Sequence, residues 1–250
     1  MISYLPRYLM IVLASATLTL GTLHQHQLDT DYIAIFFNSL GVYLVYNRYQ
    51  VLEKKHPLTL KISYFILFLI SCITGYYYIN SLLNLLLVGI IAGFGLLYTN
   101  TIPLVHKSLR DITGLKLFLV ITSWFYVIIF LPIQNNNLTI HVKEIDLFTC
   151  IMIFVVGFAF DIRDRDIDPP TRKTLPQLIG KNASIVLVYL ALSISIFVIH
   201  KPNTIQGFLY ATSILINIIC VAYQKFHKNP LYGTMLEFSL VLWGIGMYLE

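Results

Sequence analysis

Residues 157–180, GFAFDIRDRDIDPPTRKTLPQLIG, join the end of an apolar segment to a dense group of charged side chains. Four aspartates and four basic residues fall within these positions, although the chain is 57% hydrophobic and only 12% charged. An apolar run that passes directly into clustered charge is typical of a membrane helix that ends at the water interface. The stretch therefore predicts a helix end at a membrane surface.

The rest of the chain has the composition of an integral membrane protein. Its mean hydropathy is +0.75 over 250 residues, and nine segments approach the roughly 20 apolar residues that a membrane span needs. These segments are residues 8–24, 32–50, 60–80, 82–99, 112–133, 145–161, 182–200, 206–223 and 231–249. They are too long and too continuously apolar for barrel strands, so we expect an all-α membrane bundle of nine transmembrane helices. Residues 1–250 then form one domain, and no removable signal peptide is expected.

Basic residues indicate the orientation in the membrane. Of the 17 Lys and Arg residues, only Lys143 and Lys201 fall on one side of the expected spans, and all the others fall on the opposite side. The positive-inside rule then predicts a cytoplasmic amino terminus and an outer carboxyl terminus, and we expect the bacterial inner membrane. Because topology accounts for the net charge of +5, no nucleic-acid partner is expected.

The aspartates of residues 157–180 have a helical spacing. If the helix continues past Phe160, then Asp161, Asp164 and Asp168 stand at i, i+3 and i+7, within an arc of about 60°. Aligned carboxylates repel one another unless a cation binds, and Mg²⁺ prefers such hard oxygen ligands together with substrate phosphates. The alternative is a solvated helix end whose aspartates pair with nearby arginines such as Arg163, Arg165 and Arg172.

The segment DIRDRDID followed by KTLPQLIG resembles the second aspartate-rich motif of the UbiA superfamily of intramembrane prenyltransferases. The resemblance implies nine helices and a first acidic motif at the end of the second helix, where this chain has YLVYNRYQV at residues 43–51. The three aspartate positions of that first motif correspond here to Leu44, Asn47 and Val51, so the resemblance implies a weakened first metal site.

The resemblance also implies a diphosphate site that is rich in basic residues. It places residues 104–116 between the fourth and fifth helices, where family members hold the diphosphate. The implied substrate-binding residues are Asn47, Arg48, Lys107, Arg110, Lys116 and Lys173. The alternative is that these charges only set the topology of the loops.

The implied reaction moves an isoprenoid group from a prenyl diphosphate to an aromatic or lipid-like acceptor, with Mg²⁺ held by the catalytic residues Asp161, Asp164 and Asp168. Phe158 and Phe160 could offer aromatic faces to the prenyl cation. Two alternatives remain open: a catalytically silent relative that binds an isoprenoid or a quinone, and a transporter, which only the helix number and Glu237 inside an apolar run suggest. The sequence leaves open the acceptor, the prenyl chain length, the pathway and the oligomeric state.

Overall fold

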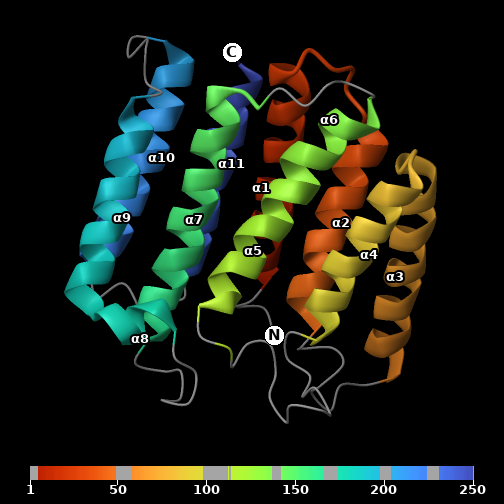
Figure 1. Ribbon diagram of the computed structural model, residues 1–250, viewed down its shortest axis with the longest axis horizontal. Helices are drawn as coiled ribbons and strands as arrows, with labels where there is room; N and C mark the ends of the chain where they lie inside the picture. Colours follow the sequence, from red (N-terminus) through yellow and green to blue (C-terminus); the bar gives the residue numbers. More distant parts are fainter. Residues whose placement is uncertain are drawn as a thin grey trace.

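The computed structural model describes residues 5–48, 58–97, 112, 114–136, 142–165, 174–197, 204–223 and 231–249. Within those residues, every regular element is a helix, so the all-α expectation is confirmed. The helices lie side by side as a bundle, with their axes running roughly between the same two ends (Figure 1). Their order and bounds are α1 (Leu5–Gln25), α2 (Tyr32–Arg48), α3 (Leu58–Tyr78), α4 (Leu82–Leu97), α5 (Leu115–Phe125), η3 (Tyr126–Phe130), α6 (Leu131–Asn135), α7 (Glu144–Asp164), α8 (Leu175–Ile179), α9 (Lys181–Ile196), α10 (Ile205–Ala222) and α11 (Leu231–Tyr248).

Each of the nine expected apolar segments contains a helix in the described part of the chain. The fifth is continuous through α5, η3 and α6, with a π turn at Tyr126–Phe130. The short helix α8 was not expected. It begins after Thr174, which forms a capping box with Gln177, and Pro176 lies in its first turn, where proline is well tolerated.

Within the described residues, four helical stretches are long and apolar enough to cross a membrane. They are Lys61–Tyr78, Leu117–Asn135, Glu144–Asp164 and Ile205–Ala222. Shorter apolar helices occupy Leu9–Gln25, Tyr32–Leu44, Leu82–Gly93 and Lys181–Ile196. The protein therefore has the helices of a membrane protein.

The distribution of side chains supports the same conclusion. Large apolar side chains point outward, and Phe65, Leu83 and Leu190 are each more than half exposed. Polar side chains lie between the helices, where Asn38 and Asn217 are fully buried. A water-soluble bundle would place these groups the other way round, so this arrangement is consistent with lipid around the bundle.

The central packing joins the two ends of the chain. α1 lies along α11, and Gly244 of α11 approaches the backbone of Thr17 and Leu18 in α1. α7 packs against α11 on another side, where the indole of Trp243 donates a hydrogen bond of 3.0 Å to Thr149. These contacts hold α7, which carries the acidic motif, against the core of the bundle.

Candidate functional site

The acidic motif begins in the last turn of α7. The helix continues past Phe160 as far as Asp164, so the expected extension beyond the apolar run is confirmed for that turn. Asp161 is 2% exposed, and its neighbours Phe158, Ala159 and Ile162 are also buried. The helix therefore places a carboxylate inside the bundle rather than in open water, where an ionisable group requires specific partners.

Asp164 lies one turn further along and has a different environment. Its Oδ1 accepts a hydrogen bond of 2.6 Å from Nε of Arg163, and the two side chains are 22% and 18% exposed. Asp164 therefore forms an ion pair with a nearby arginine, which was the alternative to metal binding. Any cation that binds Asp164 must compete with this guanidinium.

Aromatic rings surround the Arg163 guanidinium. Its carbon lies 5.0 Å from the centroid of Phe160 and 5.9 Å from that of Tyr232, within the range of a cation–π interaction. The two rings meet edge to face at 6.4 Å, and the Tyr232 hydroxyl donates a hydrogen bond of 3.2 Å to the carbonyl of Ala159. Phe160 thus lies against a cation of the protein itself, and Phe158 is buried and stacked on Phe154.

α8 is connected to the same end of α7. The Gln177 side chain donates through Nε2 to the carbonyl of Arg165 at 3.1 Å, and its Oε1 accepts from the Thr174 N–H at 3.1 Å. A single glutamine therefore caps α8 and contacts the residue that follows α7. The TLPQ segment positions a short helix directly beside the acidic turn.

For some of the other predicted site residues the structure describes only the backbone, and the rest lie outside the described residues. Asn47 and Arg48 end α2, and Lys116 is the second residue of α5. Both helix ends lie at the same end of the bundle as Asp164 (Figure 1). Their side chains are not among those described, and Lys107, Arg110, Asp168 and Lys173 lie outside the described residues.

The described carboxylates suit the donor chemistry of Mg²⁺. This ion commonly binds one or two carboxylates, and water and substrate phosphates complete its coordination shell. Asp161 and Asp164 are two carboxylates one helical turn apart. No group of three or more His, Cys, Asp and Glu side chains that could hold a metal occurs among the described residues, which do not include Asp168. The described residues could thus supply two of the three expected ligands.

Sequence reasoning did not identify Tyr232 as part of this region. No local pattern marks it, because one tyrosine at the start of an apolar helix is ordinary in a chain with 17 tyrosines. Its position follows only from the packing of α11 against α7. Glu237, in contrast, carried a signal as an acid within an apolar run, and it is buried at 2% exposure.

Comparison with known proteins adds no assignment. No model of a known protein family matches the chain, and no curated protein is similar to it.

Proposed function

We propose that this chain is a UbiA-like prenyltransferase with nine membrane-spanning helices, a cytoplasmic amino terminus and an outer carboxyl terminus, in the bacterial inner membrane. It moves an isoprenoid group from a prenyl diphosphate to an aromatic or lipid-like acceptor. The observation that carries the proposal is the burial of Asp161 at the end of an apolar helix, within DIRDRDID. An acid buried in a membrane bundle is costly to maintain, so it indicates a functional site.

The chemistry requires two opposite charges to be stabilised. Breaking the allylic C–O bond leaves a negative pyrophosphate and a prenyl cation, and preorganised groups that face both charges lower the barrier. Mg²⁺ held by Asp161, Asp164 and Asp168 would supply positive charge beside the departing pyrophosphate. Asn47, Arg48, Lys107, Arg110, Lys116 and Lys173 would bind the diphosphate oxygens through charged and polar hydrogen bonds.

The apolar helices contribute by binding the isoprenoid chain and excluding water. A prenyl cation that meets water is lost as an alcohol, so the reacting carbon must stay within an apolar environment. Asp161 is itself buried, at 2% exposure, which supports a reaction at the boundary between the charged helix end and the bundle interior.

A second candidate function is a silent UbiA-like protein that binds an isoprenoid or a quinone. Two observations favour it. Asp164 is paired with Arg163 at 2.6 Å, and Leu44 and Val51 stand where the resembled first motif has aspartates. In this alternative the acidic helix end is a structural network of ion pairs.

The test compares carboxylate variants of the purified full-length protein in detergent. Farnesyl diphosphate and Mg²⁺ are supplied with a bacterial lipid extract as the source of acceptors, and pyrophosphate release is measured. We expect Asp161→Asn and Asp164→Asn each to lose at least about a hundredfold in rate, because each removes a charge from the metal site. Asp29→Asn is the matched control, since Asp29 is exposed between α1 and α2, and the adjoining ends of these helices lie at the end of the bundle opposite the acidic end of α7 (Figure 1).

Circular dichroism of the variants separates loss of activity from loss of fold. Wild-type turnover in both folded variants would exclude the metal role of these aspartates. Binding of farnesyl diphosphate without any pyrophosphate release by the wild type would favour the silent protein.

A further inference from the structure

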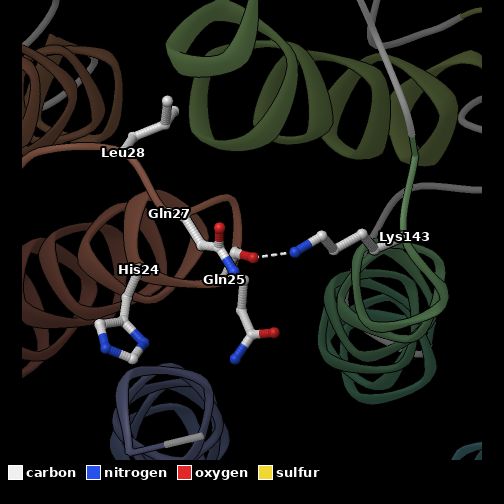
Figure 2. Close-up of a pocket in the computed structure, with 5 residues that line it drawn as sticks. All are labelled: His24, Gln25, Gln27, Leu28 and Lys143. Carbon is white, nitrogen blue, oxygen red and sulfur yellow. Dashed lines mark hydrogen bonds between the residues drawn. The ribbon is translucent and has the colours of Figure 1, made fainter. Parts of the chain in front are cut away.

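A cavity of about 470 Å³ lies at the end of the bundle opposite Asp161. His24, Gln25, Gln27, Leu28 and Lys143 line it, so it joins the carboxyl end of α1 to the residue that precedes α7 (Figure 2). Its volume is within the range of small-molecule sites, roughly 300–1,000 Å³, and exceeds what a bare inorganic ion needs. Four of its five described lining residues have a polar or charged side chain, and Leu28 is apolar.

Hydrogen bonds to neighbouring helices fix the walls of this cavity. The Lys143 ammonium donates to the carbonyl of Gln25, as the dashed line in Figure 2 marks. The Gln25 side chain donates through Nε2 to the carbonyl of Met247 at 2.6 Å. In addition, His26 Nε2 lies 2.9 Å from Asp146 Oδ2, and the same oxygen accepts a hydrogen bond of 2.8 Å from the backbone N–H of Lys143. α1, α7 and α11 are thus connected around the cavity, which requires little rearrangement to accept a ligand.

Among the described residues that line the cavity, Lys143 supplies a positive charge. Within the described residues, no carboxylate lies within 4.0 Å of the Lys143 ammonium. Oδ2 of the nearby Asp146 is engaged by His26 and by the Lys143 N–H. An ammonium has three N–H donors, and the contact with Gln25 uses one of them. The exposed His24 ring lies 5.1 Å from the Tyr248 ring, centroid to centroid, at a tilt of 57°, and its nitrogens make no hydrogen bond with a described residue. Among the described residues, the Lys143 ammonium therefore keeps donors for an anionic group.

Gln27 adds an independent observation. Its φ of 56° is left-handed, at the position after α1 where glycine is strongly preferred. The Gln27 N–H donates to the carbonyl of His24 and the Leu28 N–H to that of Leu23, each at 2.9 Å, which is the Schellman pattern. A glycine would form this cap with less strain but would remove an amide side chain from the cavity wall.

We propose that this cavity binds an organic phosphate, with Lys143 as the donor to the phosphate oxygens and Gln27 as a further donor from the wall. The His24 ring, which is turned toward α11 in Figure 2, lines the space for the organic part. An ammonium group donates charge-assisted hydrogen bonds to phosphate, and the remaining volume accommodates the organic part. Such a phosphate can be the headgroup of an anionic phospholipid or a soluble phosphate ester. The site is remote from the acidic end of α7 and does not depend on the proposed prenyl transfer.

The test measures binding to the full-length protein with two probes. Glycerol 3-phosphate is titrated by calorimetry into protein in neutral detergent, and thermal stability is compared in nanodiscs of phosphatidylglycerol and of phosphatidylcholine. Binding of glycerol 3-phosphate would support the site with a soluble ester as ligand. A higher melting temperature in phosphatidylglycerol, without binding of the ester, would support it with a lipid headgroup as ligand.

Variants decide whether Lys143 is responsible for binding. We expect Lys143→Gln, which removes the ammonium charge and keeps a polar side chain, to weaken binding of the active probe about tenfold or to abolish its stabilising effect. Lys61→Gln, on α3 at the other end of the bundle, should change neither result. Gln27→Gly should weaken binding while the melting temperature without ligand stays unchanged or rises, and it tests the site even if Lys143→Gln fails to fold. Absence of any response to both probes, or full binding by both cavity variants, would overturn the proposal.

Discussion

At the scale of single residues, one motif contains two aspartates in different environments. Asp161 is 2% exposed within the bundle, whereas the Asp164 side chain is 22% exposed and paired with Arg163. Their sequence spacing of three places both in one helix turn, but it does not reveal that the first is buried in the bundle and the second is paired with an arginine. Arg163 in turn lies against Phe160 and Tyr232, which restricts where its guanidinium can move.

Arg163 is expected to compete with Mg²⁺ for Asp164. We predict that Arg163→Gln strengthens apparent Mg²⁺ binding, but by less than about fivefold, because a partly exposed ion pair is worth only about 0.2–1 kcal/mol. The measurement is the Mg²⁺ dependence of pyrophosphate release. Arg165→Gln is the control, since among the described residues only the backbone carbonyl of Arg165 makes a hydrogen bond. Weaker Mg²⁺ binding by Arg163→Gln would show that this arginine supports the site rather than competing for it.

At the scale of elements, the π turn Tyr126–Phe130 receives a polar contact from α2. The Asn38 side chain donates through Nδ2 to the carbonyl of Val127 at 2.9 Å and to the Thr19 hydroxyl at 3.2 Å. Thr19 in turn donates to the carbonyl of Ser15 at 2.9 Å. A π turn departs from the regular α-helical ladder, so a side chain that satisfies one of its carbonyls stabilises it.

We predict that Asn38→Ala lowers the free energy of unfolding by about 1–3 kcal/mol, because it removes a buried donor from the Val127 carbonyl and from Thr19. Thermal unfolding in detergent, followed by circular dichroism, measures the change. Ser63→Ala is the control, because Ser63 is exposed and its hydroxyl bonds only within its own helix. Equal melting temperatures for Asn38→Ala and the wild type would exclude this role for Asn38.

The pairing of α1 with α11 depends on a close approach at Gly244. A Cβ atom there would lie 2.6 Å from the carbonyl carbon of Thr17 and 2.7 Å from the backbone N of Leu18. These are backbone atoms, so the two helices would have to move apart. A Cβ atom added at Gly89 in α4 would instead meet open space, with no neighbouring atom within 4 Å.

We therefore predict that Gly244→Ala lowers the free energy of unfolding by about 1–3 kcal/mol through overpacking. Gly89→Ala should leave stability unchanged or raise it slightly, because alanine is the better helix former. Both variants are measured by thermal unfolding in the same detergent. A Gly244→Ala protein as stable as Gly89→Ala would mean that the α1 and α11 backbones are not in close contact.

At the scale of the whole molecule, the two ends of the bundle have different chemistry. One end carries the acidic turn of α7 and the ends of α2 and α5, and the other carries the cavity around Lys143 (Figure 1). The exposed apolar side chains of α3, α4 and α9 lie between these ends. This arrangement suits a protein that meets water at both ends and lipid around its sides.

The proposed orientation predicts which end a reagent outside the cell can reach. In a protein without Cys72, Cys150 and Cys220, we expect Thr30→Cys to react with a membrane-impermeant maleimide on spheroplasts. Thr30 is exposed between α1 and α2, and the adjoining ends of these helices lie at the end of the bundle opposite the acidic end of α7 (Figure 1). Thr59→Cys, exposed near the start of α3, should react only after permeabilisation. Labelling of Thr59→Cys in intact spheroplasts would contradict the orientation.

The sequence by itself determined where the helices lie and where charge collects. Apolar length and helical spacing are properties of one segment, so they predicted the helical segments and the acidic end of α7. Only the tertiary structure decided that Asp161 is buried, that Tyr232 lies beside Arg163 and that Lys143 meets Gln25. These facts depend on which helix covers which face, and lipid-facing and helix-facing apolar residues have similar patterns in the sequence.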